Sequence, residues 1–169
     1  MYRAIVVDDE PSMLEGMRLM IDWNACGFML AGGAATAEEA LALVKASRPD
    51  LVVTDIRMPG LLGTDLAERL SREYPDVIVL FFSGYRDFAY AQAAIRSQVF
   101  GYLLKPIDPD EVHIALRGVR AELDKRREEK KEPAAQTLRD HMLRRLAYGD
   151  DGAETLARCE MLLGIDKDV

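Results

Sequence analysis

Short, continuously apolar segments alternate with amphipathic segments along most of the chain. The apolar segments are rich in β-branched or aromatic residues and are typical of strands buried on both faces, as in a parallel sheet. They cover residues 3–7, 28–33, 51–54, 77–82 and 101–104. Because helical patterns lie between them, the sequence predicts an α/β fold with a doubly wound, five-stranded parallel sheet and right-handed crossovers.

The amphipathic segments predict helices over residues 12–22, 36–47, 64–74 and 88–97. The first has apolar residues at i, i+1, i+4, i+7 and i+8, the spacing of one helical face. These residues are Met13, Leu14, Met17, Met20 and Ile21. The second opens with Thr36 and has Glu39 three residues later, which is a capping-box pattern.

A further helix is expected after "KPIDPDE", and it begins the C-terminal part of the chain. Its inward face is predicted to consist of Val112, Leu116, Val119 and Leu123. The interleaved charges of residues 124–133 are typical of a solvated helix end, and Pro133 predicts a break. Residues 134–148 and 153–163 again have helical patterns. The sequence therefore predicts a C-terminal helical extension.

Length, charge and cysteine content limit the possible functions. The 169 residues suffice for one domain and an appendage, and the net charge of -7 disfavours DNA binding by this chain alone. Cys26 and Cys159 form neither a CxxC pair nor a Cys/His cluster, so we expect reduced thiols rather than disulfides or zinc. Acids at position 8 and the lack of an apolar run of ~20 residues argue against a signal peptide and a membrane span. We expect a soluble, cytoplasmic protein.

Polar residues follow four of the predicted strands at the point where each strand ends. They are Asp8, Asp9 and Glu10 after the first strand, Asp55 after the third, Ser83 after the fourth and Lys105 after the fifth. Ligands of open α/β sheets gather at the carboxyl ends of the strands. The sequence therefore predicts a rim that carries several carboxylates, one hydroxyl and one ammonium group.

This set of groups suits phosphoryl chemistry. Clustered carboxylates favour Mg²⁺, which takes a few protein oxygens and keeps several waters. A carboxylate beside Mg²⁺ can attack phosphorus and form an aspartyl phosphate. Such a transfer needs positioning and charge neutralisation, which Mg²⁺ and Lys105 can supply, while Ser83 can donate a hydrogen bond to a phosphoryl oxygen.

Four stretches in order, "IVVDDEP", "PDLVVTDIRMPG", "VIVLFFSGY" and "GYLLKP", resemble the receiver domain of two-component response regulators. The resemblance covers about residues 1–125 and implies a flavodoxin-like receiver fold. It also implies that Asp55 is the phosphoacceptor for a sensor histidine kinase and that the domain is not an enzyme. The Lys105–Pro106 bond is typically cis in such domains.

The resemblance further implies roles for the residues around Asp55. Mg²⁺ would be held by Asp8, Asp9, Asp55 and the carbonyl of Arg57. Ser83 and Lys105 would contact the phosphoryl group, and Tyr102 would be the switch aromatic.

Finer features are similar to one subfamily. "SGYRDFAYAQ" and "YLLKPIDPDE" look like receivers of AraC-type transcriptional regulators, and residues 126–169 look like the linker of those proteins. Their DNA-binding domain is a C-terminal pair of helix-turn-helix units, which this sequence lacks. We therefore expect a truncated regulator that binds DNA only through the missing domain and that can form a homodimer.

Two other functions stay open at this point. An Mg²⁺-dependent phosphatase of the haloacid-dehalogenase type also forms an aspartyl phosphate, but it needs a DxD pair after the first strand, where this chain has Asp8 and Asp9 adjacent. A phosphorylation-independent interaction module on the same fold would not need all of the acids, the serine and the lysine at the rim. Since fold does not determine function, the choice depends on the site.

Overall fold

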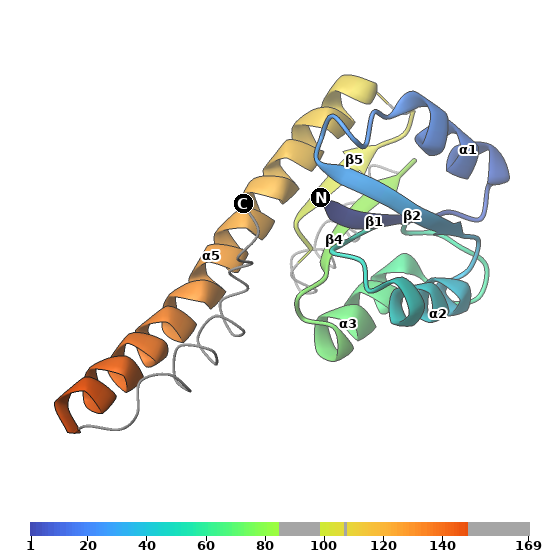
Figure 1. Cartoon of the computed structure of the whole chain (residues 1–169). Helices are drawn as coiled ribbons and strands as arrows, with labels where there is room; N and C mark the ends of the chain where they lie inside the picture. Colours follow the sequence, from blue (N-terminus) through green and yellow to red (C-terminus); the bar gives the residue numbers. More distant parts are fainter. Residues whose placement is uncertain (85–98, 107, 149–169) are drawn as a thin grey trace. The chain divides into compact units, whose positions relative to one another are not determined.

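The computed structural model describes residues 1–84, 99–106 and 108–148, with side chains up to Lys131. The chain divides into two compact units, Met1–Leu123 and Asp124–Val169. The first unit contains a five-stranded sheet in the order β2-β1-β3-β4-β5, and every neighbouring pair is parallel (Figure 1). This is the flavodoxin-like strand order, and it confirms the predicted fold class.

The strands lie within one residue of the predicted ranges at each end. They are β1 (Tyr2–Val7), β2 (Phe28–Ala34), β3 (Leu51–Asp55), β4 (Ile78–Ser83) and β5 (Gly101–Leu104). All residues of β3 and β4 are buried. Their sequences are almost uninterrupted apolar runs because helices cover both faces of the sheet.

The described helices are α1 (Pro11–Met20), α2 (Ala37–Ser47), α3 (Gly63–Glu73) and α5 (Pro109–Tyr148). At the start of α2, the N–H of Glu39 donates to Thr36 Oγ1 at 3.2 Å, as the capping-box pattern predicts. The Glu39 carboxylate accepts from the N–H of Ala35 at 2.9 Å, one residue before the expected donor. The helices predicted over 88–97 and 153–163 lie outside the described residues.

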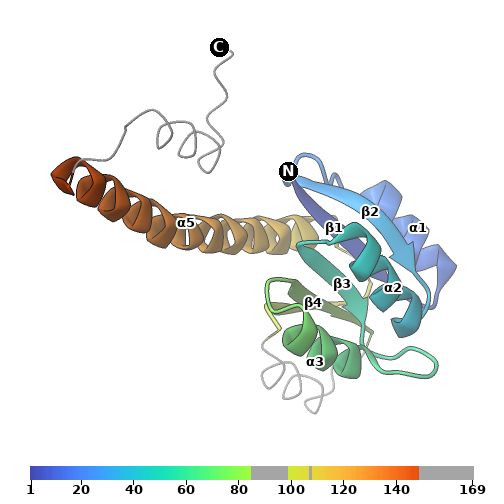
Figure 2. The same cartoon turned by 60° about the horizontal axis from the view of Figure 1, so that its bottom comes forward.

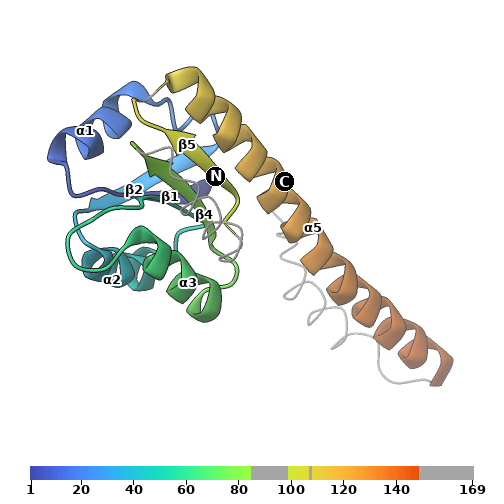
Figure 3. The ribbon, with the colours of Figure 1, turned by 180° about the vertical axis from the view of Figure 1, so that it is seen from behind.

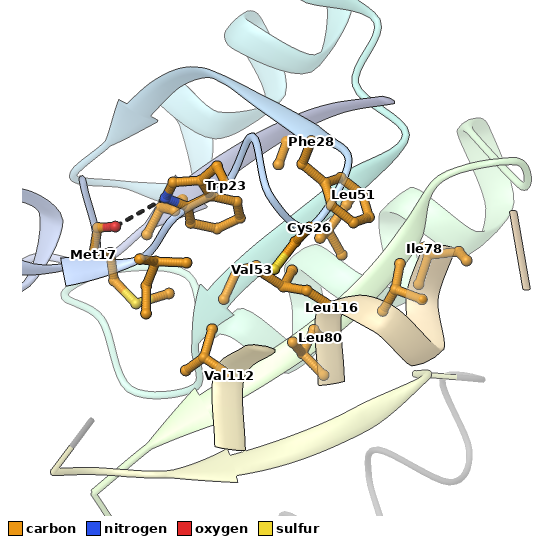
Figure 4. Close-up of a cluster of buried hydrophobic side chains, with 14 of the residues drawn as sticks. Met17, Trp23, Cys26, Phe28, Leu51, Val53, Ile78, Leu80, Val112 and Leu116 are labelled. Carbon is orange, nitrogen blue, oxygen red and sulfur yellow. Dashed lines mark hydrogen bonds between the residues drawn. The ribbon is translucent and has the colours of Figure 1, made fainter. Parts of the chain in front are cut away.

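Helices cover the sheet on both sides. Helices α2 and α3 pack on one face (Figure 2), and α1 and the first turns of α5 pack on the other (Figure 3). The predicted inward face of α5 is buried, from Val112 to Leu123. Trp23 joins this core cluster and donates its indole N–H to the Met17 carbonyl at 2.9 Å (Figure 4).

The predicted inward face of α1 is correct only in part. Met17 and Ile21 are buried, whereas Met20 is 54% exposed. Helix α1 ends at Met20, and Ile21 has extended backbone geometry. Helical spacing therefore no longer determines which side chain faces the sheet at this end.

The predicted break at Pro133 is wrong, because α5 continues through it as one helix of 40 residues. A proline inside a helix removes one backbone hydrogen bond and costs about 3 kcal/mol. The flanking residues are mostly Glu, Lys, Arg and Ala, which have high helix propensity, and they outweigh that cost. Among the described residues, no helix combines the length and apolar character needed to cross a bilayer.

Candidate functional site

The carboxyl ends of β1, β3 and β5 bring three of the predicted site residues into direct contact. Asp8 follows β1, Asp55 ends β3 and Lys105 follows β5. The ammonium nitrogen of Lys105 lies 2.7 Å from Asp8 Oδ2 and 2.8 Å from Asp55 Oδ2. Residues almost a hundred positions apart thus meet because parallel strands end at the same edge of the sheet.

The Asp55 carboxylate is held by the chain around it. The backbone N–H of Ile56 donates to Oδ1 at 2.6 Å, and the N–H of Arg57 donates to the same oxygen at 3.3 Å. The Thr54 hydroxyl donates to the Asp55 carbonyl oxygen at 2.9 Å. Oδ1 is therefore oriented by backbone amides, whereas Oδ2 faces Lys105.

Asp8 is the most buried acid of the site, with 2% exposure. Burial raises the pKa of Asp8, although hydrogen bonds from Lys105 and from the Glu10 N–H oppose the change. Burial by itself would lower the pKa of Lys105, but the hydrogen bonds and charges of Asp55 and Asp8 outweigh it and raise that pKa. Lys105 is therefore a permanent cation at neutral pH.

The acids fit a divalent cation. Carboxylate oxygens of Asp8, Asp9 and Asp55 all lie within 4.8 Å of one another, and Asp9 is the most accessible of the three. Three negative charges face one ammonium group, so the cluster retains excess negative charge. Hard oxygen donors that leave positions open for water match the preference of Mg²⁺.

Ser83 and Tyr102 lie next to this cluster on neighbouring strands. Ser83 is the buried last residue of β4, and its carbonyl accepts the N–H of Lys105 at 2.9 Å. Tyr102 of β5 is half-buried and is paired with Phe81, two residues before Ser83. Because strand side chains alternate, Ser83 and Tyr102 are diagonal neighbours on one face of the sheet. The Lys105–Pro106 bond is cis, as expected.

Three contacts at the site were not predicted. The Lys105 ammonium lies 5.5 Å from the centroid of the Phe82 ring and 3.8 Å from Glu10 Oε1. Gly63 packs its backbone directly on the Asp55 carbonyl. In the sequence, Phe82 is indistinguishable from a core residue, and Glu10 resembles an ordinary acid near a helix start. Of the three, only the contact at Gly63 could have been suspected from the sequence, because glycine suits positions where two backbone segments approach closely.

Residues 4–117 match the family model of the response regulator receiver domain. The chain belongs to this family. Residues 4–117 thus belong among the receiver domains of response regulators, the signalling proteins of two-component systems.

Two curated relatives are transcriptional regulatory proteins. The chain is 35% identical over 134 residues to the uncharacterized transcriptional regulatory protein YesN of Bacillus subtilis (strain 168), covering 79% of this chain and 36% of that protein. It is 38% identical over 116 residues to the transcriptional regulatory protein HptR of Staphylococcus aureus (strain NCTC 8325 / PS 47), covering 69% of this chain and 45% of HptR. The chain thus spans less than half the length of each relative.

Two solved structures share the receiver fold. One is the REC domain of AraT, a response regulator from Geobacillus stearothermophilus, with a TM-score of 0.70 and 35% identity over 75% of this chain and 98% of that chain. The other is a two-component transcriptional regulator AraC from Clostridium phytofermentans ISDg, with a TM-score of 0.69 and 34% identity over 74% of this chain and 97% of that one.

Proposed function

We propose that this receiver accepts a phosphoryl group from a sensor histidine kinase on Asp55 and thereby switches an attached transcription-regulating domain. The observation that carries the proposal is the position of Asp55, whose Oδ2 lies 2.8 Å from the Lys105 ammonium and close to the carboxylates of Asp8 and Asp9. A carboxylate fixed between a cation and a metal-binding pair of acids is arranged for phosphoryl transfer.

Asp8, Asp9, Asp55 and the carbonyl of Arg57 would hold Mg²⁺. When bound, Mg²⁺ supplies positive charge that offsets the phosphoryl oxygens. Asp55 attacks phosphorus through a carboxylate oxygen, so an O–P bond forms as the P–N bond of the phosphohistidine breaks. The electron pair of that bond stays on the imidazole nitrogen. Lys105 and the Ser83 hydroxyl bind the phosphoryl oxygens, and the domain acts as a stoichiometric acceptor rather than an enzyme.

Phosphorylation then acts through Ser83 and Tyr102. The Ser83 hydroxyl turns toward the phosphoryl group, and the Tyr102 ring fills the space behind it. The new hydrogen bond and the buried ring each contribute ~1 kcal/mol. A full reversal of an equilibrium needs roughly 5 kcal/mol, so the Lys105–phosphoryl ion pair, loop ordering or dimerisation must supply the remainder.

The output domain is proposed to be of the AraC type. Residues 1–125 form the receiver, and residues 126–169 form the linker toward a DNA-binding domain. The resemblance of the motifs and the two AraC- and AraT-named structures support this assignment. A homodimer formed through the surface of the helix predicted over residues 88–97, β5 and α5 would bring two such DNA-binding domains together.

The phosphoacceptor is tested by incubating the chain with acetyl phosphate and Mg²⁺ and measuring its intact mass. We expect one phosphoryl adduct in the wild type and none in Asp55→Asn. Asp50→Asn is the matched control, because Asp50 precedes the same strand at its other end and accepts the Arg3 N–H at 2.7 Å. An adduct that persists in Asp55→Asn would refute the assignment.

The switch is tested with beryllofluoride, which mimics the phosphoryl group. We expect it to shift the sedimentation profile or to change amide exchange over residues 84–105 in the wild type but not in Tyr102→Ala. Tyr74→Ala, a half-buried tyrosine at the end of α3, serves as the control. Bound beryllofluoride without either change in the wild type would contradict the switch.

A further inference from the structure

The ammonium group of Lys105 lies over the aromatic ring of Phe82. The Nζ atom is 5.5 Å from the ring centroid, within the range of a cation–π interaction. Phe82 is the penultimate residue of β4 and is 3% exposed, packed in the core cluster beneath α1 and α5. Its ring is therefore held by packing in the core.

The rest of the Lys105 side chain also runs along the end of β4. The Lys105 N–H is bound to the Ser83 carbonyl, and a β carbon placed on Gly84 would be 4.0 Å from both Cβ and Cδ of Lys105. The long, flexible stem of a lysine loses conformational entropy when its ammonium is held at one point. Contact with β4 reduces the number of positions that the ammonium group can reach.

The other partners of Lys105 change during the proposed reaction. In this structure the ammonium is bound by the carboxylates of Asp8 and Asp55. The proposed function requires these carboxylates to bind a cation, and it turns Asp55 into an acyl phosphate. The Phe82 ring neither ionises nor binds Mg²⁺, so its attraction for the ammonium is unchanged throughout.

We propose that Phe82 is a positioning residue that keeps the Lys105 ammonium at the phosphoryl group when the carboxylates are engaged elsewhere. This inference rests on the proposed function of Asp55 and Lys105. It assigns to the ring an electrostatic role through its quadrupole, in addition to its place in the core.

Pentafluorophenylalanine at position 82 tests this role, because it keeps the shape of the ring and reverses its quadrupole. We expect the rate of phosphorylation by acetyl phosphate at fixed Mg²⁺ to fall about fivefold. Phe82→Leu, which removes the quadrupole without reversing it, should show a smaller loss. The matched control is pentafluorophenylalanine at Phe81, which is fully buried in the cluster on the opposite face of the sheet and should leave the rate unchanged. In a Lys105→Met background, the change at position 82 should have no further effect.

A second measurement does not depend on the reaction. The ε-methylene signals of Lys105 should show an upfield ring-current shift in the metal-free protein and should keep it when beryllofluoride and Mg²⁺ are bound. A wild-type rate in the fluorinated protein, or loss of the ring-current shift in the complex, would overturn the positioning role. Failure of the wild type to form the Asp55 adduct would instead refute the proposed function, and the metal-free spectrum would still report whether the ring contacts Lys105.

Discussion

Gly63, at the start of α3, packs its backbone directly against the carbonyl oxygen of Asp55. A β carbon at position 63 would overlap that oxygen and would lie 3.0 Å from the Ile56 Cα. The Gly63 N–H also donates to the Ile56 carbonyl at 2.9 Å. The first turn of α3 is therefore held against the last residue of β3, which fixes the loop that follows the proposed phosphoacceptor.

Gly63→Ala should consequently destabilise the protein. The added methyl group meets backbone atoms, which cannot move aside as a flexible side chain does, so we expect a loss of about 1–3 kcal/mol in the free energy of unfolding. Gly16→Ala is the matched control, because nothing lies within 4 Å of a β carbon there and Gly16 is inside α1. It should stabilise the protein by about 0.5–1 kcal/mol in urea unfolding. Equal effects of the two changes would contradict the packing at Gly63.

Asp8→Asn should stabilise the metal-free protein at neutral pH. Burial raises the pKa of Asp8 above its ordinary value of 3.8, so its contribution to stability is fully present below that pH and is lost as pH rises through the folded-state pKa. Replacement by the uncharged amide removes this loss. We expect the melting temperature at pH 7 to rise by a few degrees, the shift that about 1 kcal/mol produces.

Two controls accompany the Asp8 prediction. The advantage of Asp8→Asn should shrink as pH falls through the folded-state pKa of Asp8, because the wild-type carboxyl is then protonated in the folded protein. In millimolar Mg²⁺ the wild type should have the higher melting temperature of the two, because it gains stability from metal binding and the variant gains less. An advantage that is independent of both pH and Mg²⁺ would disprove the electrostatic cause.

Cys26 should react slowly with thiol reagents in the folded protein. It is 5% exposed, and its burial raises the pKa of the thiol, although Arg117 lowers it in part. The thiolate is the reactive form, so in a Cys159→Ser background we expect labelling at pH 8 at least ~10-fold slower than in denaturant. Because the pKa of Cys26 is raised in the folded protein, ionisation of the thiol lowers the free energy of unfolding as pH rises above 9.0, the ordinary pKa of the group. Cys26→Ala should not show this loss. Rapid labelling under native conditions would show that Cys26 is accessible.

Trp23→Phe should weaken the core beneath α1. The substitution removes the indole N–H, so the Met17 carbonyl loses its donor in a buried position. We expect a loss of about 1–3 kcal/mol in the free energy of unfolding, measured by circular dichroism in urea. Met20→Ala, on the exposed side of the same helix, should change stability by no more than ~0.5 kcal/mol. A neutral result for Trp23→Phe would mean that the hydrogen bond has little value.

Pro133→Ala should strengthen the C-terminal part of α5. The proline interrupts the ladder of backbone hydrogen bonds, and alanine restores the missing donor. We expect slower amide exchange over residues 130–140, with no change in the exchange of β3 and β4. Unchanged exchange around position 133 would show that the proline already fits the helix without cost.

The sequence by itself was sufficient to determine the layout of the sheet and the identity of the groups at its edge. The strands β3 and β4 are buried on both faces, so their apolar runs are almost unbroken and end at Asp55 and Ser83. The same argument located Asp8 and Lys105. The positions of the strands and the gathering of their polar ends at one edge follow from local patterns and chain direction, both of which a sequence contains. The strand order was implied only by the resemblance to receiver domains, and the register came from the structure.

Only the tertiary structure decided which of these groups touch and what surrounds them. The Lys105 ammonium could have reached Asp8, Asp55 or solvent, and its placement over Phe82 depends on packing between β4 and β5. The sequence likewise did not indicate that Met17 is buried while Met20 is exposed, or that α5 continues through Pro133. The reason is common to these cases. A local pattern gives a preference of about 1 to 3 kcal/mol. Contacts between distant residues are of similar size and decide the outcome, but no local pattern records them.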